Sequence, residues 1–427
     1  MASTAGTPSA PDPQDPTGLR ARARGALLGL AVGDALGAPA ENMKPSEIRA
    51  RWGRITGYVA HDPAGTDDTE YAIFSGLLLA RHGSALTPAH VEAAWHELIA
   101  DRHEGPFRGA GFSERGTLEN LRRGLAAPIS AQHRHAWSDG LAMRAAPFGV
   151  FAAGRPAEAA RLVAIDGSVS HDGEGIYGGR AVAAGVAAAM AGAQVIAVVA
   201  AALAVVPDDS WTARCLRRAV TAAHRGERAV RSAVVIGGYP WTDLAPEAVA
   251  LAFGAYAAAD GDFEQSVLTA VNMGRDADTT AAVAGALAGA TQGVSAIPAG
   301  WAAPVGPVRG SCLPAMAGYH VLDVADLLTP PHRTPQPPPP TPGRAPAGPV
   351  QAPADLGPTL VDPEPAPAYL GPASADPGRA PADRGPAPAY LGPAPTDPGR
   401  APADRGPAPA YLGPAPTDPG RAPADRG

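Results

Sequence analysis

The sequence predicts an all-α fold, with one large multi-helix domain over residues 19–328. Ala-rich apolar segments alternate there with Gly and Pro, and stretches with the alternating pattern of a β-strand are scarce. Thr87-Pro88 and Ala245-Pro246 have the form of helix starts, because proline is favoured at the first helical position. A domain of roughly 300 residues can bury a substantial core.

The expected helices follow the apolar segments in chain order. They cover residues 22–33, 70–82, 88–102, 113–125, 156–165, 179–205, 209–224, 246–258, 263–272 and 279–290. The uncharged stretch from Ala181 to Val206 is long enough to cross a bilayer. It is mostly Ala and Gly, which contribute little transfer free energy, and Gln194 interrupts it. We therefore interpret it as one or two buried helices, packed closely through small residues like the similar run after Asp278.

The overall composition argues against several classes of protein. A net charge of −7 and 5% aromatic residues provide no basic field for specific nucleic-acid binding. Cys215 and Cys312 show neither a disulfide framework nor a metal-ligand spacing, which favours a reducing, cytoplasmic location. Residues 1–18 are rich in Pro, Ser and Thr and lack the apolar core of a signal peptide, so we expect them to be disordered.

The composition changes completely in the C-terminal part, residues 329–427. Pro, Ala and Gly dominate, and a 21-residue unit occurs three times, at 365–385, 386–406 and 407–427. Such a sequence cannot bury enough apolar surface to offset its conformational entropy. We expect a disordered Pro-rich tail that acts as a spacer or as a ligand for proline-recognising modules.

Two acidic, hydroxyl-containing sequences carry the strongest chemical signal. Thr66-Asp67-Asp68-Thr69 and Asp276-Ala277-Asp278-Thr279 each precede an apolar run that predicts a helix. Thr and Asp are common helix caps, but two adjacent carboxylates exceed what a cap requires and repel each other without a cation. Residues i and i+2 of a helix diverge by about 200°, so Asp276 and Asp278 can bind one ion only from a helix start or a loop. Such oxygen ligands suit Mg²⁺ or Mn²⁺, and the two sequences together would form a two-metal site.

Two other interpretations of the second acidic sequence are disfavoured. Residues 276–280 satisfy the D-x-D-x-T pattern of haloacid-dehalogenase-like phosphatases, but that motif follows a hydrophobic strand, and Asn272-Met273-Gly274-Arg275 precedes this one. An EF-hand loop starting at the same point would place Ala281 and Leu287 where Gly and Glu are needed.

The order of the motifs resembles that of the ADP-ribosylglycohydrolases. The Gly- and Ala-rich run from Gly25 to Glu41 comes first, followed by the two acidic sequences. The segment from Ala142 to Gly149, which contains Met143-Arg144, and then Ser170-His171 fall between them in the family's order. The resemblance covers about residues 20–325, nearly the whole of the expected domain.

The resemblance implies an all-α fold with a central cleft that holds two Mg²⁺ or Mn²⁺ ions. Thr66, Asp67 and Asp68 would bind one ion, Asp276 and Thr279 the other, and Asp278 would bridge them. Glu41 matches the family's catalytic glutamate, and the resemblance implies a catalytic part for Asp67 and Asp278 as well. The residues that it implies for substrate binding are Gly109, Gly111, Met143, Arg144, His171 and Gly274.

Some of these residues have a second interpretation. Arg144 either meets a phosphate or pairs with a surface acid, and His171 either contacts the substrate or has a structural role. We expect Asp34 to orient the first helix by hydrogen bonding rather than to bind metal. The Gly-rich loop from Gly109 to Gly116 matches neither the P-loop nor the dinucleotide fingerprint, although it can border the cleft.

The chain departs from the family pattern in three places. Glu70-Tyr71 follows the first acidic sequence where Met or Gln-Met is common, Arg275 replaces a small residue, and residues 170–179 are richer in charge and glycine. We expect these positions to line the substrate cleft and to affect substrate identity.

The resemblance implies an enzyme that hydrolyses the bond between ADP-ribose and an acceptor. The acceptor would be a protein side chain such as arginine, or a small molecule, with no membrane involved. Two alternatives stay open: a hydrolase of small ribosylated metabolites or nucleosides, and a non-catalytic binding or structural protein on the same fold. The intact acidic sequences and Glu41 argue against the second.

Overall fold

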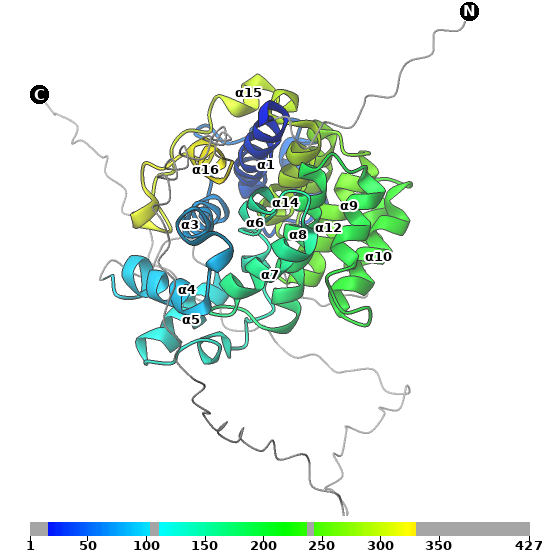
Figure 1. Cartoon of the computed structure of the whole chain (residues 1–427). Helices are drawn as coiled ribbons and strands as arrows, with labels where there is room; N and C mark the ends of the chain where they lie inside the picture. Colours follow the sequence, from blue (N-terminus) through cyan, green and yellow to red (C-terminus); the bar gives the residue numbers. More distant parts are fainter. Residues whose placement is uncertain (1–15, 103–110, 237–242, 330–427) are drawn as a thin grey trace, which may run out of the picture. The chain divides into compact units, whose positions relative to one another are not determined.

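The structure, a computed structural model, describes residues 16–102, 111–236 and 243–329. Every regular element in these ranges is helical, which confirms the predicted all-α class (Figure 1). The helices are α1 (Pro16–Gly37), α2 (Pro45–Trp52), α3 (Asp67–His82), α4 (Pro88–Trp95), α5 (Phe112–Arg122), α6 (Ala146–Phe151), α7 (Pro156–Gly167), α8 (Gly173–Met190), α9 (Val195–Leu203), α10 (Trp211–Ala223), α11 (Glu227–Val235), α12 (Ala245–Ala258), α13 (Phe263–Asn272), α14 (Ala277–Gln292), α15 (Ala299–Ala302) and α16 (Val321–Leu328).

The expected helices are present, with instructive differences at their ends. The stretch expected as 179–205 forms two helices, α8 and α9, because the chain turns at Gly192, whose φ of 79° cannot continue a helix. The helix expected over 88–102 is α4 followed by a π-helical turn, His96–Ala100. The sequence pattern does not predict the shorter helices α2, α6, α11, α15 and α16.

The centre of the fold is an unusually close contact between α1 and α14 (Figure 1). Glycine recurs every fourth residue along one face of α1, at Gly25, Gly29, Gly33 and Gly37. A Cβ added to Gly33 would lie 2.1 Å from the carbonyl oxygen of Ala281, and the other three would meet α14 carbonyl oxygens at 2.3–2.4 Å. Gly25 meets the C-terminal end of α14 and Gly37 its first residue, so the two helices run antiparallel. The end of α1 that leads to Glu41 therefore lies beside the start of α14, where Asp278 is.

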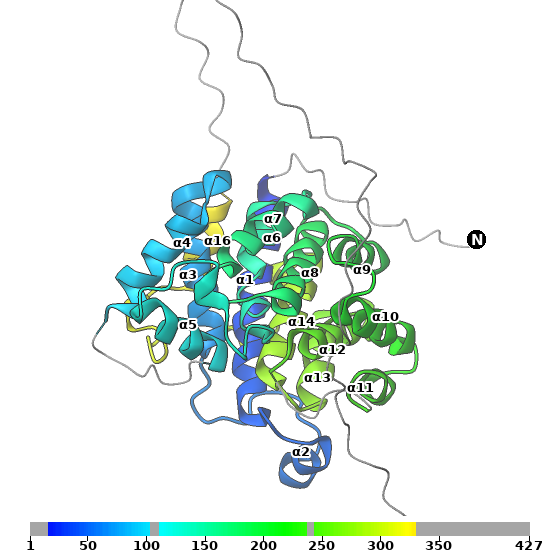
Figure 2. The ribbon, with the colours of Figure 1, turned by 90° about the horizontal axis from the view of Figure 1, so that it is seen from below.

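Other helices cover this pair from both sides (Figure 2). Helices α8, α12 and α13 pack against α14, and α10 and α11 lie outside α12. On the other side, α3 and α16 pack together beside α1. Asp326 of α16 pairs with both Arg20 and Arg24 of α1, and these two guanidinium groups hold the pKa of its carboxyl below the usual range.

Across the described ranges, no helix combines the length and the hydrophobicity that a bilayer-spanning segment needs. The uncharged stretch after Ala181 is instead the buried α8 followed by the partly exposed α9. As expected, small residues allow close packing of α14, although its closest partner is α1.

Candidate active site

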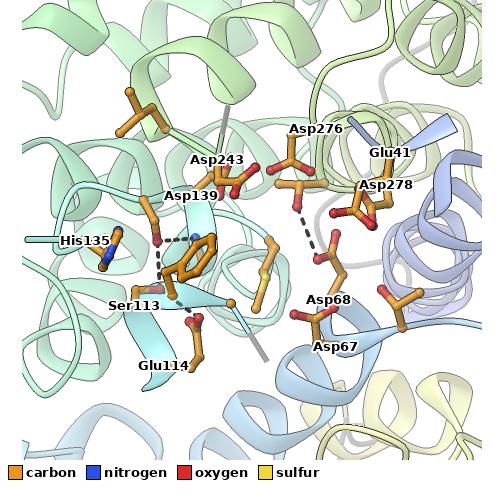
Figure 3. Close-up of a pocket in the computed structure, with 18 of the residues that line it drawn as sticks. Glu41, Asp67, Asp68, Ser113, Glu114, His135, Asp139, Asp243, Asp276 and Asp278 are labelled. Carbon is orange, nitrogen blue, oxygen red and sulfur yellow. Dashed lines mark hydrogen bonds between the residues drawn. The ribbon is translucent and has the colours of Figure 1, made fainter. Parts of the chain in front are cut away.

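The fold brings the two acidic sequences together at the starts of α3 and α14. The Thr279 hydroxyl donates a hydrogen bond to Asp68 Oδ1 at 3.2 Å, which joins residues that are 211 positions apart in the chain. Asp68, Asp276 and Asp278 are buried. Figure 3 shows Asp67 and Asp68 facing Asp278 across a pocket, with Asp276 and Glu41 beside Asp278.

This pocket has a volume of about 680 Å³, in the range of small-molecule sites. Nine residues of the predicted site line it: Glu41, Thr66, Asp67, Asp68, Gly111, Met143, Asp276, Asp278 and Thr279. Of the other four predicted residues, Gly109 lies outside the described residues, and Arg144, His171 and Gly274 are not part of the pocket wall.

Asp34 of α1 orients the first acidic sequence. Its buried carboxylate accepts hydrogen bonds from the backbone N–H of Thr66 at 2.7 Å and from the Thr66 hydroxyl at 2.8 Å. It also accepts from the backbone N–H and the hydroxyl of Thr69. Burial raises the pKa of Asp34 to about 6, and the hydrogen bonds from the two threonines oppose that rise. Because the Thr66 hydroxyl hydrogen points at Asp34, the lone pairs of its oxygen are free for the pocket. Asp34 thus forms hydrogen bonds as expected, but they orient the first acidic sequence rather than the first helix.

The loop that carries Glu41 is tied to the loop before Asp276. The Asn42 N–H donates to the Arg275 carbonyl at 2.7 Å, and the Arg275 N–H donates to the Met43 carbonyl at 3.0 Å. Gly274 has a φ of 65°, and a Cβ there would lie 2.1 Å from the Met43 carbonyl oxygen. Gly274, predicted to contact substrate, is not in the pocket wall and allows the close approach of the two loops.

Mutual repulsion and burial dominate the electrostatics of the cluster. Burial raises the pKa of Asp67, Asp68, Asp276 and Asp278 well above the usual range, and the negative charges of neighbouring carboxylates raise it further. Within the described part of the chain, the buried atoms Asp68 Oδ2 and Asp278 Oδ1 have no hydrogen-bond partner. Buried carboxylates that have an unpartnered oxygen atom and no counter-charge are ligands that suit a hard divalent cation.

The side chains as placed are not gathered around one point. No group of three or more His, Cys, Asp or Glu residues in the described ranges is arranged to hold a metal ion. Each ligand set that the resemblance implies includes a threonine hydroxyl, Thr66 in one and Thr279 in the other. The residue types fit a pair of Mg²⁺ ions, and the unpartnered oxygen atoms are the structural observation that supports this fit.

Arg144 and His171 have structural positions outside the pocket wall, which for His171 is one of the two interpretations given above. The Arg144 side chain is fully buried and pairs with Asp166 at 2.8 Å and with Glu114 at 3.7 Å, so it meets neither a surface acid nor the pocket. His171 accepts or donates hydrogen bonds with Ser138 at 3.1 Å and Ser170 at 2.8 Å. Burial, together with the charge of Arg144, holds the pKa of His171 well below its usual range, so the imidazole is neutral. Both residues support the pocket wall from behind.

The three departures from the family pattern also lie outside the wall, contrary to our expectation. The Glu70 carboxylate accepts hydrogen bonds from the backbone N–H groups of Ser311, Cys312 and Leu313 and so anchors that loop. Tyr71 is buried in the core, and Arg275 pairs with Glu247. Residues 170–179 form the turn into α8 and its first two turns, behind the wall.

Several pocket residues have no counterpart in the sequence prediction. They are Asn42, Arg134, His135, Ser138, Asp139, Gly140, Asp243 and Leu244, whereas Phe112, Ser113 and Glu114 belong to the Gly-rich loop expected to border the cleft. Phe112 stacks on His135, with ring centroids 5.0 Å apart, and 59% of its surface is exposed. Asp139 comes four residues before Met143, so its place next to a recognised motif is the one signal that could have identified it. No local pattern distinguishes Asp243.

Comparisons with known proteins agree with this geometry. The sequence model for ADP-ribosylglycohydrolases matches residues 15–332. An uncharacterized protein of Archaeoglobus fulgidus is 32% identical over 303 residues, which cover 65% of this chain and 89% of that protein. The ADP-ribosyl-[dinitrogen reductase] glycohydrolase of Rhodospirillum rubrum is 29% identical over 302 residues, covering 66% and 88%.

A solved structure described as an ADP-ribosylglycohydrolase-related protein complex has a TM-score of 0.55 and 25% sequence identity. The similarity covers 73% of this chain and 98% of that one. The helical fold, the paired acidic helix starts and the sequence match over the described domain agree with one another: the chain belongs to the ADP-ribosylglycohydrolase family.

Proposed function

We propose that this protein uses two Mg²⁺ ions, with Mn²⁺ as the alternative, to hydrolyse the glycosidic bond between ADP-ribose and an acceptor. Family membership supports hydrolysis of ADP-ribose linkages in general. The observation that supports metal-dependent hydrolysis is that Asp67, Asp68, Asp276 and Asp278 line one pocket. Two buried oxygen atoms in this cluster, Asp68 Oδ2 and Asp278 Oδ1, have no hydrogen-bond partner among the described residues.

The proposed ligand sets are those that the family resemblance implies. Thr66, Asp67 and Asp68 at the start of α3 would hold one ion. Asp276 and Thr279 at the start of α14 would hold the other, and Asp278 would contact both. When bound, the ions supply Lewis-acid stabilisation of developing charge and orient the hydroxyl groups of the ribose.

Glu41 is the residue best placed to transfer a proton. It lines the pocket, next to residues that hydrogen-bond to the loop before α14. Partial burial and the charge of Asp243 raise the pKa of Glu41, which favours its protonated form relative to an exposed glutamate. It would protonate the departing acceptor or deprotonate the attacking water as the bond opens through an oxocarbenium-like state.

The other side of the pocket suits the nucleotide part of the substrate. In Figure 3, His135 lies on the side away from Asp67, Asp68 and Asp278. The Phe112 ring stacked on His135 offers an exposed aromatic face for a purine, and Arg134 beside it offers a guanidinium group for a diphosphate. The pocket therefore has an aromatic, basic side and an acidic side, as an ADP-ribose ligand with ion-bound ribose requires.

The test is a substrate screen with the purified full chain. ADP-ribosyl-arginine, ADP-ribosyl-serine peptides and ribosylated nucleosides are each incubated with Mg²⁺, with Mn²⁺ or with EDTA, and free ADP-ribose is measured by liquid chromatography and mass spectrometry. We expect ADP-ribose to be released only when a divalent ion is present. Turnover of nucleosides alone would favour the small-metabolite hydrolase, and ADP-ribose binding without any turnover would favour a binding protein. The cytoplasmic location and the proline-module partner of the tail stay predictions from the sequence.

A further inference from the structure

Helix α2, which follows the Glu41 loop, contributes little to the core and carries mostly charge. Ile48 is its one buried residue. Arg49 and Arg51 lie in its last turn, Lys44 precedes it, and all three basic side chains belong to exposed residues. The chain as a whole has a net charge of −7, so a short, exposed and basic helix differs from the average surface of this protein.

The basic surface continues from α2 onto α11. Arg54, just after α2, pairs with Glu227 at the start of α11, with 2.6 Å between Nη1 and Oε2. Arg228 and Arg231 of α11 are three positions apart, so they are neighbours on the helix surface. Burial lowers the pKa of Arg231 and the positive charge of Arg49 adds to this effect, which places Arg49 of α2 near α11. Figure 2 shows α2 at the edge of the domain, near α11. We define the basic face as Lys44, Arg49, Arg51, Arg228 and Arg231.

Most of the basic face has no acidic partner. Among the described residues, Lys44, Arg49, Arg51 and Arg228 form no ion pair. The Arg51 guanidinium lies 4.5 Å from the centre of the Trp52 ring, a contact that restricts its motion and leaves its N–H edges available. A guanidinium group that is already held in place loses less entropy when it binds a carboxylate.

The acidic residues of these two helices are already engaged. The Glu47 carboxylate accepts a hydrogen bond from the backbone N–H of Lys44 at 2.6 Å, at the start of α2. Glu227 pairs with Arg54. Neither carboxylate is paired with Arg49 or with the other basic side chains of the face. The positive charge of the basic face therefore stays available to a partner.

The basic face lies close to the pocket in the chain and in space. Glu41 and Asn42 line the pocket, and α2 begins at Pro45. The backbone hydrogen bonds of Asn42 and Met43 with Arg275 hold this connection against the loop before α14. A macromolecule that places one residue beside Glu41 would therefore bring its neighbouring residues to α2.

The mixed charge of this region favours a polypeptide over a nucleic acid. Glu41, Asp243 and Asp276 line the pocket next to the basic face. A nucleic-acid strand carries a negative charge at every nucleotide, so a strand lying on α2 would also meet these carboxylates. A polypeptide can place acidic residues on the basic face and a residue of another kind at the pocket.

We propose that the basic face binds acidic residues of the polypeptide that carries the ADP-ribose. The protein would then prefer substrates with glutamate or aspartate close to the modified residue. This inference rests on the proposed function, because it assigns the neighbouring sequence of the substrate. It concerns the residues that flank the modified one and not the bond that is broken.

The first test measures binding alone. Two unmodified, fluorescein-labelled peptides of equal length, one rich in glutamate and one with glutamine at the same positions, are titrated with the full chain and followed by fluorescence anisotropy. We expect the glutamate peptide to bind about two- to thirtyfold more tightly at low ionic strength, the range for two exposed ion pairs. The difference should disappear in 0.5 M salt, at roughly four times the ionic strength at which the Debye length is 8 Å. In the double variant Arg49→Gln, Arg51→Gln, the two peptides should bind equally.

The second test measures turnover with Mg²⁺. The same two sequences, each with ADP-ribosyl-arginine at the centre, are compared by kcat/KM. The ratio for the glutamate peptide to the glutamine peptide should exceed one by a similar factor in the unaltered chain and fall to about one in the double variant. Turnover of the glutamine peptide should not change, because Arg49 and Arg51 are not in the pocket wall.

The matched control is Arg81→Gln. Arg81 is an exposed arginine in the last turn of α3, at the opposite end of that helix from the pocket. This variant should keep the preference of the unaltered chain in both tests.

Three results would overturn the proposal: equal binding of both peptides by the unaltered chain, the same loss in Arg81→Gln, or tighter binding of a single-stranded oligonucleotide than of the glutamate peptide. The last result would make this face a nucleic-acid surface. Binding of the glutamate peptide that depends on Arg49 and Arg51, without release of ADP-ribose from either modified peptide, would instead overturn the proposed function and leave the basic face as a binding surface for acidic peptides.

Discussion

Gly33 of α1 lies directly against the Ala281 carbonyl of α14, with no space for a side chain between the two helices. The same contact occurs one helical turn in either direction, at Gly29 and Gly37. Close packing is necessary here because α1 leads to Glu41 and α14 begins next to Asp276. The distance between the proposed proton donor and the proposed metal site therefore depends on the separation of these two helices.

Gly33→Ala should destabilise the protein, although helix propensity alone predicts that it stabilises it. Alanine favours a helix by about 1 kcal/mol relative to glycine, which alone would stabilise the variant. The new Cβ would lie 2.1 Å from the Ala281 oxygen, so the helices must separate. Overpacking of this kind costs about 1–3 kcal/mol or more, which we expect to outweigh the propensity gain. Chemical denaturation measures the free energy of unfolding.

Gly306→Ala is the control for this prediction, because a Cβ there meets open space. Its stability should change by no more than about 0.5 kcal/mol. Equal stability of the two variants would show that the helices are not as close as the structure places them.

His171 should make the protein less stable at acidic pH. Its pKa is depressed in the folded state, mainly by burial, so folding favours the neutral imidazole. The associated stability is fully present above the pKa of the unfolded state, about 6.5, and is lost as the pH falls below it. The loss has a limiting slope of about 1.4 kcal/mol per pH unit for this one group.

A comparison of His171→Asn with the unaltered chain isolates this contribution. Asparagine does not titrate and can still hydrogen-bond to Ser138 or Ser170, which flank the ring. Between pH 7.5 and 5.5, the unaltered chain should lose about 1–2 kcal/mol more stability than the variant. Parallel curves of unfolding free energy against pH would mean that folding does not lower the pKa of the imidazole.

The sequence predicts the fold class and the residues of the acidic cluster well, because both are local signals. Asp67 and Asp278 stand at helix starts, and a helix start is visible in a few neighbouring residues. The glycine contact between α1 and α14 is not visible in that way. Gly33 by itself indicates a weak helix. Its role in close helix packing becomes clear only when the facing residue, Ala281, is known.

Contacts between distant segments explain the errors at the site. The Met143-Arg144 motif shows that both residues belong to the pocket region, but it does not show which side chain faces inward. Arg144 faces away because Asp166, on a different helix, neutralises it in the core. A backbone hydrogen bond between residues 245 and 137 holds the chain next to Asp243 at the pocket. No residue spacing in the sequence predicts that Asp243 belongs to the site.

Deletion of residues 341–427 should leave the catalytic domain intact. The last described helix, α16, ends at Leu328, and its Asp326 is already paired with α1. The composition of the repeats predicts no packed core in the deleted part. The melting temperature and the rate of ADP-ribose release should stay within error of the full chain. A loss of several degrees would show that the repeats contribute to the fold.

Asp278→Asn provides the sharpest test of the metal site, because it predicts opposite effects with and without Mg²⁺. In EDTA, the variant should be at least as stable as the unaltered chain, since one of several mutually repelling buried carboxylates becomes neutral. In Mg²⁺, the unaltered chain should gain stability as ion binding favours the folded state, and the variant should gain little. Calorimetric Mg²⁺ titration and thermal melts measure both effects. Asp62→Asn, which removes an exposed charge, should behave like the unaltered chain in both conditions. A variant that is less stable in EDTA but keeps its Mg²⁺ response would mean that Asp278 has a structural role and does not bind the ion.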